Sequence, residues 1–289
     1  MENQLMTSIK VQKMKLLVTT DFSTNSKGAI RFAKTLAKQT KNVEVVFYYA
    51  IHITKPTRWN DTFFKSYKEE EIERFTADLK KFVHTIVGKE KGEFASIKFV
   101  VENCISTEKD IIIYAEKNKI DFICIATQGA GMLRKIMGTH TSYIVNNSKV
   151  PVMVIPSRYR AKTLKKATYL SDFENLKNEV LKISKFSKEI NLNIEVLHYL
   201  TIVKDVKKFE INKALFNTKE FVDMKLNNQQ INHELSLVER VTKYVQKSKP
   251  ELLIMFTKRE KGFFESIFLP SKSAELTYTT KVPVLIFSK

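Results

Sequence analysis

Three of the chain's seven glycines lie within ten positions of one another, at Gly129, Gly131 and Gly138. They follow a short apolar segment that ends at Ala126, and Gly138 directly precedes Thr139 at the expected start of a helix. A glycine loop lets backbone N–H groups approach phosphate oxygens, and a helix N-terminus adds partial positive charge. This segment is therefore a candidate phosphate-binding loop.

A single carboxylate, Asp21, ends the first apolar segment of the chain, in the sequence V-T-T-D-F-S-T-N-S. The carboxyl ends of parallel strands are where open α/β sheets bind ligands, which makes Asp21 a candidate ligand contact. A structural interpretation competes with this one. Asp21 can cap the following helix, while Gly129 and Gly138 serve turns and a helix start without any ligand.

Other constellations that carry chemistry are missing from the sequence. There is no Walker A pattern and no G-x-S-x-G elbow, and the five histidines show no metal-ligand spacing. We therefore predict no catalytic residue and no metal site, and at most very slow turnover of a bound ligand. Cys104 and Cys124 lack a C-x-x-C spacing and are expected to be buried free thiols.

Two further residues have both a functional and a structural interpretation. His140, within G-T-H-T-S, could reach a phosphate if the loop holds one, and otherwise has a surface or packing role. Trp59 follows the second predicted strand and could cover a bound ligand, or it packs on the long helix that follows. The acidic run near Glu70 has helical spacing and is expected to be a solvated helix face.

The elements that must position these residues alternate between apolar segments and amphipathic ones. Helix-type spacing dominates residues 61–87, which should form one long helix closing at Gly88. Strands connected by helices imply crossover connections and a parallel sheet with helices on both faces. The predicted strands are residues 14–20, 43–51, 97–101, 121–126 and a last one ending at 155, then 167–170, 194–200, 221–225, 251–256 and 283–287.

The two halves of the chain repeat each other. K-L-L-V-T-T-D-F at 15–22 returns as K-A-T-Y-L-S-D-F at 166–173, and V-P-V-M-V at 150–154 returns as V-P-V-L-I at 282–286. This pattern indicates a tandem duplication. We expect a domain at 1–157 and a second at 164–289, the second shortened in the region after its second strand.

Composition limits the class of protein and its partners. The 289 residues are 43% hydrophobic and 28% charged, with no apolar run long enough for a membrane span and no signal-peptide pattern at the N-terminus. A cytoplasmic location without a membrane partner is the expectation. The net charge of +18 comes from lysines dispersed over helix faces, so we expect no specific nucleic-acid partner.

These motifs together resemble the universal stress protein (UspA-like) family of the adenine-nucleotide alpha-hydrolase-like superfamily. The resemblance runs from residue 14 to 289 and includes V-N-N-S-K-V-P-V-M-V-I-P at the end of the first half. It implies two tandem Rossmann-like α/β domains of flavodoxin-like strand order, each a five-stranded parallel sheet. It also implies that the last strands of the two halves pair as an intramolecular pseudo-dimer, with homodimers of whole chains left open.

The resemblance further implies a site for ATP, with Mg²⁺ only alongside ATP, in the first half. Family members carry G-x-x-G, nine residues and G-[ST]; Gly129 matches the second glycine, and Gly138 with Thr139 matches the end. Ala126 stands in place of the first glycine, and only eight residues separate Gly129 from Gly138. Asp21 matches the family's acidic residue, and Ala50 the position whose backbone meets adenine.

In the second half Arg259 and Pro270 replace Gly129 and Gly138, and proline removes an N–H donor where one is needed. We therefore expect no ATP there, and Asp172 to act as a helix cap. Two functions remain. The first is a stress-response protein that senses adenine nucleotides with its N-terminal domain; the second is a nucleotide-free universal stress protein acting as a scaffold or small-ligand module.

Overall fold

The computed structural model describes residues 13–288 apart from 41, 89–93, 128–138, 201–215, 217, 219–220, 222–223, 231–233 and 258–281. Most of the apolar segments in these ranges form strands, and they join in one sheet. The strands are β1 (Met14–Thr19), β2 (Val43–Ile51), β3 (Ser96–Asn103), β4 (Phe122–Ala126), β5 (Val152–Ile155), β6 (Lys166–Leu170), β7 (Asn193–Leu200), β8 (Met224–Gln230), β9 (Leu252–Thr257) and β10 (Val284–Ser288).

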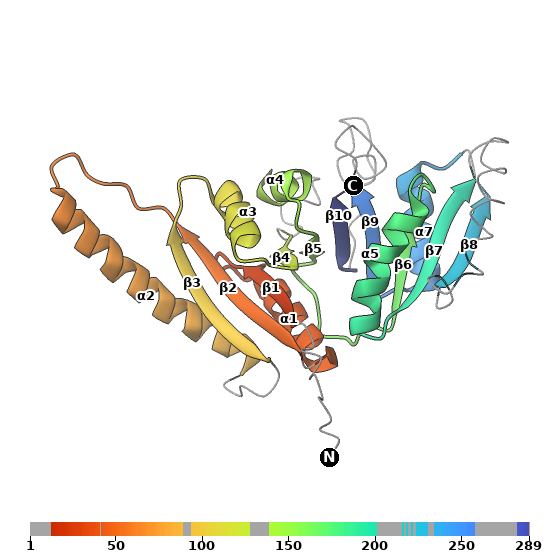
Figure 1. The fold of residues 1–289 in the computed structure, drawn as a ribbon, viewed down its shortest axis with the longest axis horizontal. Helices are drawn as coiled ribbons and strands as arrows, with labels where there is room; N and C mark the ends of the chain where they lie inside the picture. The colour runs from red at the N-terminus through yellow and green to blue at the C-terminus, as the bar shows by residue number, and fades with distance from the viewer. Residues whose placement is uncertain are drawn as a thin grey trace, which may run out of the picture.

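The strand order shows two equivalent halves, lying side by side in Figure 1. Hydrogen-bonded neighbours give the order β3-β2-β1-β4-β5-β10-β9-β6-β7-β8, so each half has the same five-strand order, read outward from the centre. All pairs are parallel except β5 with β10, which run antiparallel where the halves meet. The expected pair of tandem Rossmann-like units, packed as an intramolecular pseudo-dimer, is confirmed.

Within each half, the strand order differs from the flavodoxin-like order that we expected. A flavodoxin-like sheet places the third strand beside the first, whereas here β4 pairs with β1 and β3 pairs outside β2. The apolar pattern of a strand fixes its existence but not its neighbours, which is why sequence reasoning missed this. Strands β2 and β3 are added to one side of β1, and β4 and β5 are added to its other side. The boundary between β1 and β4 is therefore the topological switch point, where such sheets form a ligand crevice.

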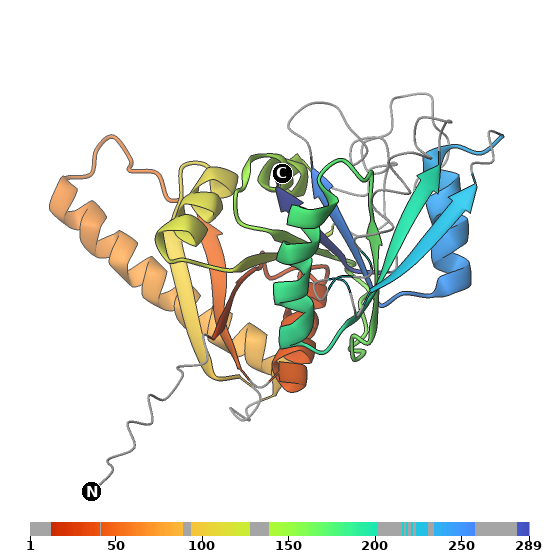
Figure 2. The same ribbon diagram turned by 45° about the vertical axis from the view of Figure 1, so that its right-hand side comes forward.

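Helices cover both faces of the sheet, as two separate sets of buried apolar side chains show. One set packs α1, α2 and α5 on one face, and the other packs α3, α4 and α7 on the opposite face. Figure 2 shows the helices distributed in front of and behind the strands. Their bounds are α1 (Lys27–Thr40), α2 (Asp61–Val87), α3 (Thr107–Lys117), α4 (Thr139–Asn147), α5 (Leu176–Glu189) and α7 (Leu237–Ser248).

The bounds of the elements follow the sequence prediction closely in the first half. Helix α2 begins after Asn60, whose side chain accepts a hydrogen bond from the Phe63 amide, and it ends at Gly88 with φ 83°. One strand of the second half is displaced, since β8 occupies Met224–Gln230 instead of residues 221–225. Phe221 is buried but lies in a turn before the strand. In the described part of the chain no helix is long and apolar enough to cross a membrane.

The turn after the first strand of each half is repeated in detail. Phe22 and Phe173 both have φ 59°, an unusual value for a side chain of this size. Their amides donate to the Thr20 and Ser171 hydroxyls at 3.2 and 3.1 Å. The carboxylates of Asp21 and Asp172 each accept from the amide two residues later at 3.0 Å. The duplication therefore extends to the strand end that carries the candidate carboxylate.

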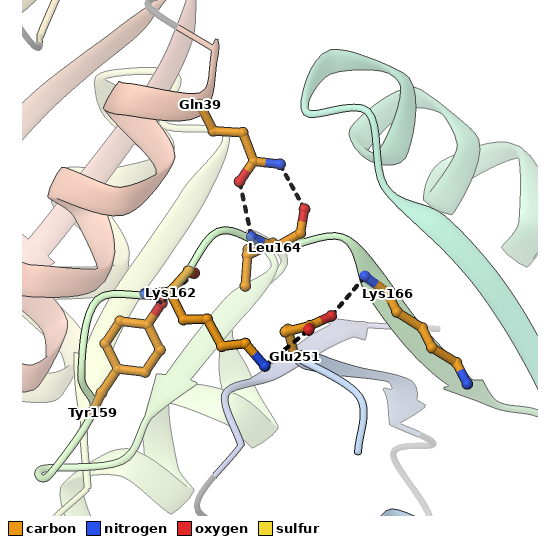
Figure 3. A network of polar contacts seen from close by, with 6 residues as sticks. All are labelled: Gln39, Tyr159, Lys162, Leu164, Lys166 and Glu251. Carbon is orange, nitrogen blue, oxygen red and sulfur yellow. Dashed lines mark hydrogen bonds and ion pairs between the residues drawn. The ribbon is translucent and has the colours of Figure 1, made fainter. Parts of the chain in front are cut away.

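The segment joining the halves, residues 156–165, contacts both of them (Figure 3). The Gln39 amide of α1 accepts from the Leu164 N–H at 3.0 Å and donates to the Leu164 carbonyl at 2.6 Å. On the other side, Glu251 accepts from the Lys166 amide at 2.8 Å and pairs with Lys162 at 3.0 Å. The connection predicted between residues 157 and 164 lies within this segment.

Candidate functional site

A cavity of about 580 Å³ opens at the switch point of the first half; we call it the strand-end cavity. It is bounded by the carboxyl ends of β1, β2 and β4 and by the first turns of α3 and α4. Its volume lies within the range of small-molecule sites. The sheet topology thus builds a ligand-sized crevice where parallel α/β sheets usually place one.

Three of the residues that the sequence singled out line this cavity together. Asp21 follows β1, Ala50 is near the end of β2, and Ala126 ends β4. Thr139 is the first residue of α4, whose next two residues also line the cavity. Gly129 and Gly138 lie outside the described residues, so the proposed phosphate loop remains a sequence prediction.

Asp21 is exposed and presents its carboxylate at the mouth of the cavity. One of its oxygens accepts the hydrogen bond from the Ser23 amide, which fixes the side chain in a tight turn. Burial raises the pKa of the neighbouring Tyr49, and the negative charge of Asp21 adds to this effect. The Tyr49 ring packs edge-on against Phe22 at 4.4 Å between centroids. Asp21 is therefore a fixed acceptor with capacity for further hydrogen bonds.

Several hydroxyl-bearing residues, among them Thr20, Ser26 and Thr127, line the cavity together with Asp21. The Thr20 and Ser26 hydroxyls are 2.8 Å apart, and both residues are buried. Ser26 in turn donates to the Ser23 carbonyl at 2.9 Å. On the β4 side, the Thr127 hydroxyl accepts from the Ser157 amide at 3.3 Å. Because hydroxyls can both donate and accept, this lining suits a ligand with several polar groups.

The backbone at Ala50 has hydrogen-bonding groups directed past the end of β1. The Tyr48 carbonyl accepts from the Thr20 amide, and the Ile51 carbonyl accepts from the Cys104 amide on the other side. Since strand residues alternate in direction, the N–H and C=O of Ala50 point to the same side as those of Tyr48. No residue of β1 is paired there, because its register ends at Thr19 opposite Tyr48. Ala50 thus offers one donor and one acceptor to the cavity.

A contact between His140, which lines the cavity, and Glu108 was missed by sequence reasoning. His140 Nδ1 of α4 lies 2.5 Å from the carboxylate of Glu108 in the first turn of α3. A hydrogen bond from its own amide and the contact with His140 hold the pKa of Glu108 below its usual value, against the effect of burial. The sequence marked His140 but not its partner, because the partner depends on α3 and α4 being neighbours.

Other predicted residues have structural surroundings. Cys104 and Cys124 are buried free thiols, as expected, and burial raises the pKa of both. Trp59 contacts Phe63 and Tyr67 of α2, with ring centroids 4.6 and 5.0 Å away, and it does not line the strand-end cavity. This is the packing role that we weighed against a lid over the base. Among the described residues, no group of His, Cys, Asp and Glu side chains could hold a metal ion.

In the second half, the site residues predicted to block a nucleotide lie outside the described residues. These are Arg259 and Pro270. Asp172 repeats the turn of Asp21, which is consistent with a local structural role. The prediction that this half does not bind ATP stays a prediction.

Comparisons with known proteins agree with this architecture. Residues 14–156 match the model of the family described as Universal stress protein family. A universal stress protein from Archaeoglobus fulgidus DSM 4304 superposes with a TM-score of 0.67 at 16% identity, over 96% of this chain and 99% of its own. A putative universal stress protein from Pseudomonas aeruginosa UCBPP-PA14 gives 0.54 at 12% identity, over 96% and 93%. At such identities the likeness establishes the fold alone. No curated protein sequence matches this chain significantly.

Proposed function

Because the chain belongs to the universal stress protein family, we propose that its N-terminal half binds an adenine nucleotide. The whole chain would then act as a stress-response protein that senses this nucleotide. The observation that carries this proposal is the meeting of Asp21, Ala50 and Ala126 around one cavity of about 580 Å³. Asp21 follows β1, Ala50 lies in β2 and Ala126 ends β4, and the sequence together with the family resemblance had singled out all three. The resemblance named ATP as the ligand, and ATP is the nucleotide we propose.

Different residues around the cavity match the ribose, the base and the phosphates of ATP, which defines how the nucleotide would lie. Asp21 is a fixed acceptor for the ribose hydroxyls, and the free N–H and C=O of Ala50 suit the edge of the base. Phosphates belong at the start of α4, where backbone N–H groups and the helix dipole favour negative charge. Mg²⁺ would arrive bound to the phosphates, since Asp21 is the one carboxylate that lines the cavity among the described residues.

We propose binding and not rapid turnover as the role of this site. Among the described lining residues, the carboxylate and imidazole groups suited to general acid or base chemistry are those of Asp21 and His140. Tyr48 and Tyr49 also line the cavity, but burial raises the pKa of both hydroxyls and so disfavours proton release. Asp21 is held in its turn, and His140 is paired with Glu108. Any hydrolysis of the nucleotide is therefore expected to be slow, which suits a sensor whose state depends on the nucleotide it holds.

Calorimetric titration of the whole chain with Mg-ATP tests the proposal. We expect saturable heat, and we expect Asp21→Ala to weaken binding by at least about ten-fold, because hydrogen bonds to a charged group contribute about 1.5–3 kcal/mol. Asp61→Ala is the matched control, since Asp61 is exposed and paired with Lys55 outside the cavity. Absence of heat with the unmodified protein would refute nucleotide binding and leave the nucleotide-free scaffold as the function.

A further inference from the structure

A second cavity, of about 590 Å³, adjoins the strand-end cavity at Tyr49 and Ala50, which line both. We call it the aromatic cavity. It lies between the end of β2, the segment that follows β2, and the first half of α2. Figure 1 shows this part of α2 extending away from the sheet, with the segment from β2 leading to its N-terminus. The function proposed above makes no use of this cavity.

Aromatic rings from three elements form the walls of the aromatic cavity. Trp59 and Tyr67 are nearly perpendicular, with ring centroids 5.0 Å apart and 86° between their planes. Tyr49 and Phe75 form a second pair at 5.6 Å and 57°. Rings of this kind bind a planar group by stacking and edge contacts without selecting for a particular hydrogen-bond pattern. The walls therefore suit an aromatic group of the ligand.

The segment carrying Trp59 is fixed by local hydrogen bonds, so the cavity exists before any ligand arrives. The Trp59 amide donates to the Pro56 carbonyl at 3.0 Å. The next residue, Asn60, caps α2 by accepting from the Phe63 amide at 2.7 Å. Lys55 pairs with Asp61 across the same turn at 2.5 Å. A preformed cavity costs less free energy to fill than one that must be ordered on binding.

The charges in the aromatic cavity favour an uncharged group over a phosphate. No lysine or arginine is among its described lining residues. Its carboxylate, Glu71, is paired with Arg74 at 2.5 Å, and the His52 ring is hydrogen-bonded to the Cys104 carbonyl at 2.9 Å. A phosphate would gain no cation there and would lose its hydration. The phosphates therefore belong at the opposite, α4 end of the strand-end cavity.

This division of charge orients the ligand, and it rests on the function proposed above. With phosphates at the start of α4, the base lies at the end of β2, where Tyr49 and Ala50 border both cavities. We propose that the aromatic cavity receives a planar, uncharged group attached to the base, so that the site prefers a base-substituted adenine nucleotide to ATP. The preferred ligand class is an adenine nucleotide whose exocyclic amine carries an aromatic or flat apolar substituent.

The test compares ATP with benzyl-ATP, in which the exocyclic adenine amine carries a benzyl group, using the whole chain and Mg²⁺. We expect benzyl-ATP to bind about ten-fold more tightly, as one added ring stacked among aromatic side chains gives. Trp59 is the chain's one tryptophan. Its fluorescence should therefore change on adding benzyl-ATP and stay nearly constant on adding ATP.

Two substitutions on one helix separate the cavity wall from its surroundings. Tyr67→Ala removes a wall of the aromatic cavity and should reduce the preference for benzyl-ATP to less than about three-fold, with ATP affinity unchanged. Phe63→Ala is the control, because Phe63 contacts Trp59 and is 56% exposed, yet does not line the cavity. It should keep the full preference.

The outcomes distinguish this inference from the function it rests on. If ATP binds and benzyl-ATP binds no more tightly, the inference is wrong and the nucleotide site stands. Tighter binding of benzyl-ATP without a change in Trp59 emission would place the ring elsewhere and equally overturn it. If neither nucleotide binds, the proposed function fails and the inference fails with it.

Discussion

Gly28 lies where helix α1 touches the chain that leaves β5. A Cβ atom built on Gly28 would sit 2.5 Å from the Pro156 carbonyl oxygen and 3.1 Å from that of Ser157. Both contacts are with backbone, which cannot rotate away as a side chain can. The absence of a side chain at this one position therefore lets the end of the first half close against the helix that follows the candidate carboxylate.

We predict that Gly28→Ala destabilises the protein by about 1–3 kcal/mol, the cost of overpacking a close contact. The usual gain from alanine in a helix, about 1 kcal/mol, is included in the net effect and does not reverse it. Urea unfolding followed by circular dichroism measures the change. Lys81→Ala, at an exposed position of the neighbouring helix α2, should stay within about 0.5 kcal/mol of the unmodified protein. Equal stability of both variants would contradict the prediction.

The second half has a different residue at the position equivalent to Gly28. The residue 151 positions after Gly28 is Glu179, which is 2% exposed and accepts a hydrogen bond from the Tyr169 hydroxyl within the core. Burial and the charge of Glu179 both raise the pKa of Tyr169. At this position helix α1 requires a residue without a side chain, whereas helix α5 carries a glutamate that is hydrogen-bonded to Tyr169. The halves share topology but have diverged in packing as well as in the candidate site.

At the scale of elements, Glu251 connects the start of β9 to the start of β6 and to the joining segment. Burial acts to raise its pKa, but the ion pair with Lys162 and the hydrogen bonds from Lys166 and its neighbour outweigh this and lower it. A lowered folded-state pKa means that this stabilisation is complete above the unfolded value of 4.5. It is lost as pH falls through the folded-state pKa.

We predict that Glu251→Gln lowers the free energy of unfolding by about 1–2 kcal/mol at neutral pH. The substitution removes the negative charge that pairs with Lys162 and accepts the hydrogen bond from the Lys166 amide. The deficit relative to the unmodified protein should shrink as the pH falls below 4.5, the ordinary pKa of a glutamate side chain. Urea unfolding at several pH values measures it. Glu116→Gln, at an exposed position of α3, is the control and should have little effect throughout. A deficit that stays constant with pH would refute the electrostatic explanation.

The elements also show how far sequence reasoning reaches. Helix α2 was bounded correctly, because an apolar stripe and Gly88 are local signals; the Asn60 cap is a further local signal that the prediction did not use. Strand β8 was displaced, because it lies at the edge of the sheet and carries polar residues such as Asn227 and Asn228, whereas the apolar Phe221 before it is buried in a turn. An edge strand needs fewer apolar side chains, so its pattern is weak.

Some features of the candidate site could be predicted from the sequence, and others could not. Asp21 was found because it follows the first strand, and the carboxyl ends of parallel strands share one edge of the sheet. Ala50 and Ala126 were named because the family resemblance implies ligand contacts at their positions. The contact between His140 and Glu108, and the aromatic cavity beside Tyr49, depend on which elements are neighbours. Apolar periodicity carries no information about strand order. These features could therefore come only from the assembled sheet.

At the scale of the whole molecule, the antiparallel pair of β5 and β10 makes one sheet from two units. Its register places Val154 opposite Val284, Met153 opposite Leu285 and Val152 opposite Ile286. The Pro151 carbonyl accepts from the Ile123 amide of β4, so by alternation Met153 also faces β4 while Val152 and Val154 face β10. Without the second half, β5 would be an edge strand with unpaired backbone N–H and C=O groups and with apolar side chains.

We predict that the isolated fragment 1–157 forms a dimer through β5, because an exposed edge strand pairs with an identical one to satisfy its backbone groups. Sedimentation at tens of micromolar protein measures the mass. Val154→Pro in the fragment is the decisive variant. It removes an N–H that faces β10 and leaves the ladder with β4 intact, and proline is tolerated at a strand edge that faces water.

The fragment with Val154→Pro should therefore be a monomer with the circular dichroism of the unmodified fragment. A monomeric unmodified fragment, or a dimer that survives the substitution, would show that β5 does not drive association. All of the described residues that line the strand-end cavity lie in the first half and none belongs to β5, so the nucleotide affinity of the dimeric and monomeric fragments should also match. Agreement there would assign nucleotide binding to the first half and a structural role at the β5–β10 boundary to the second.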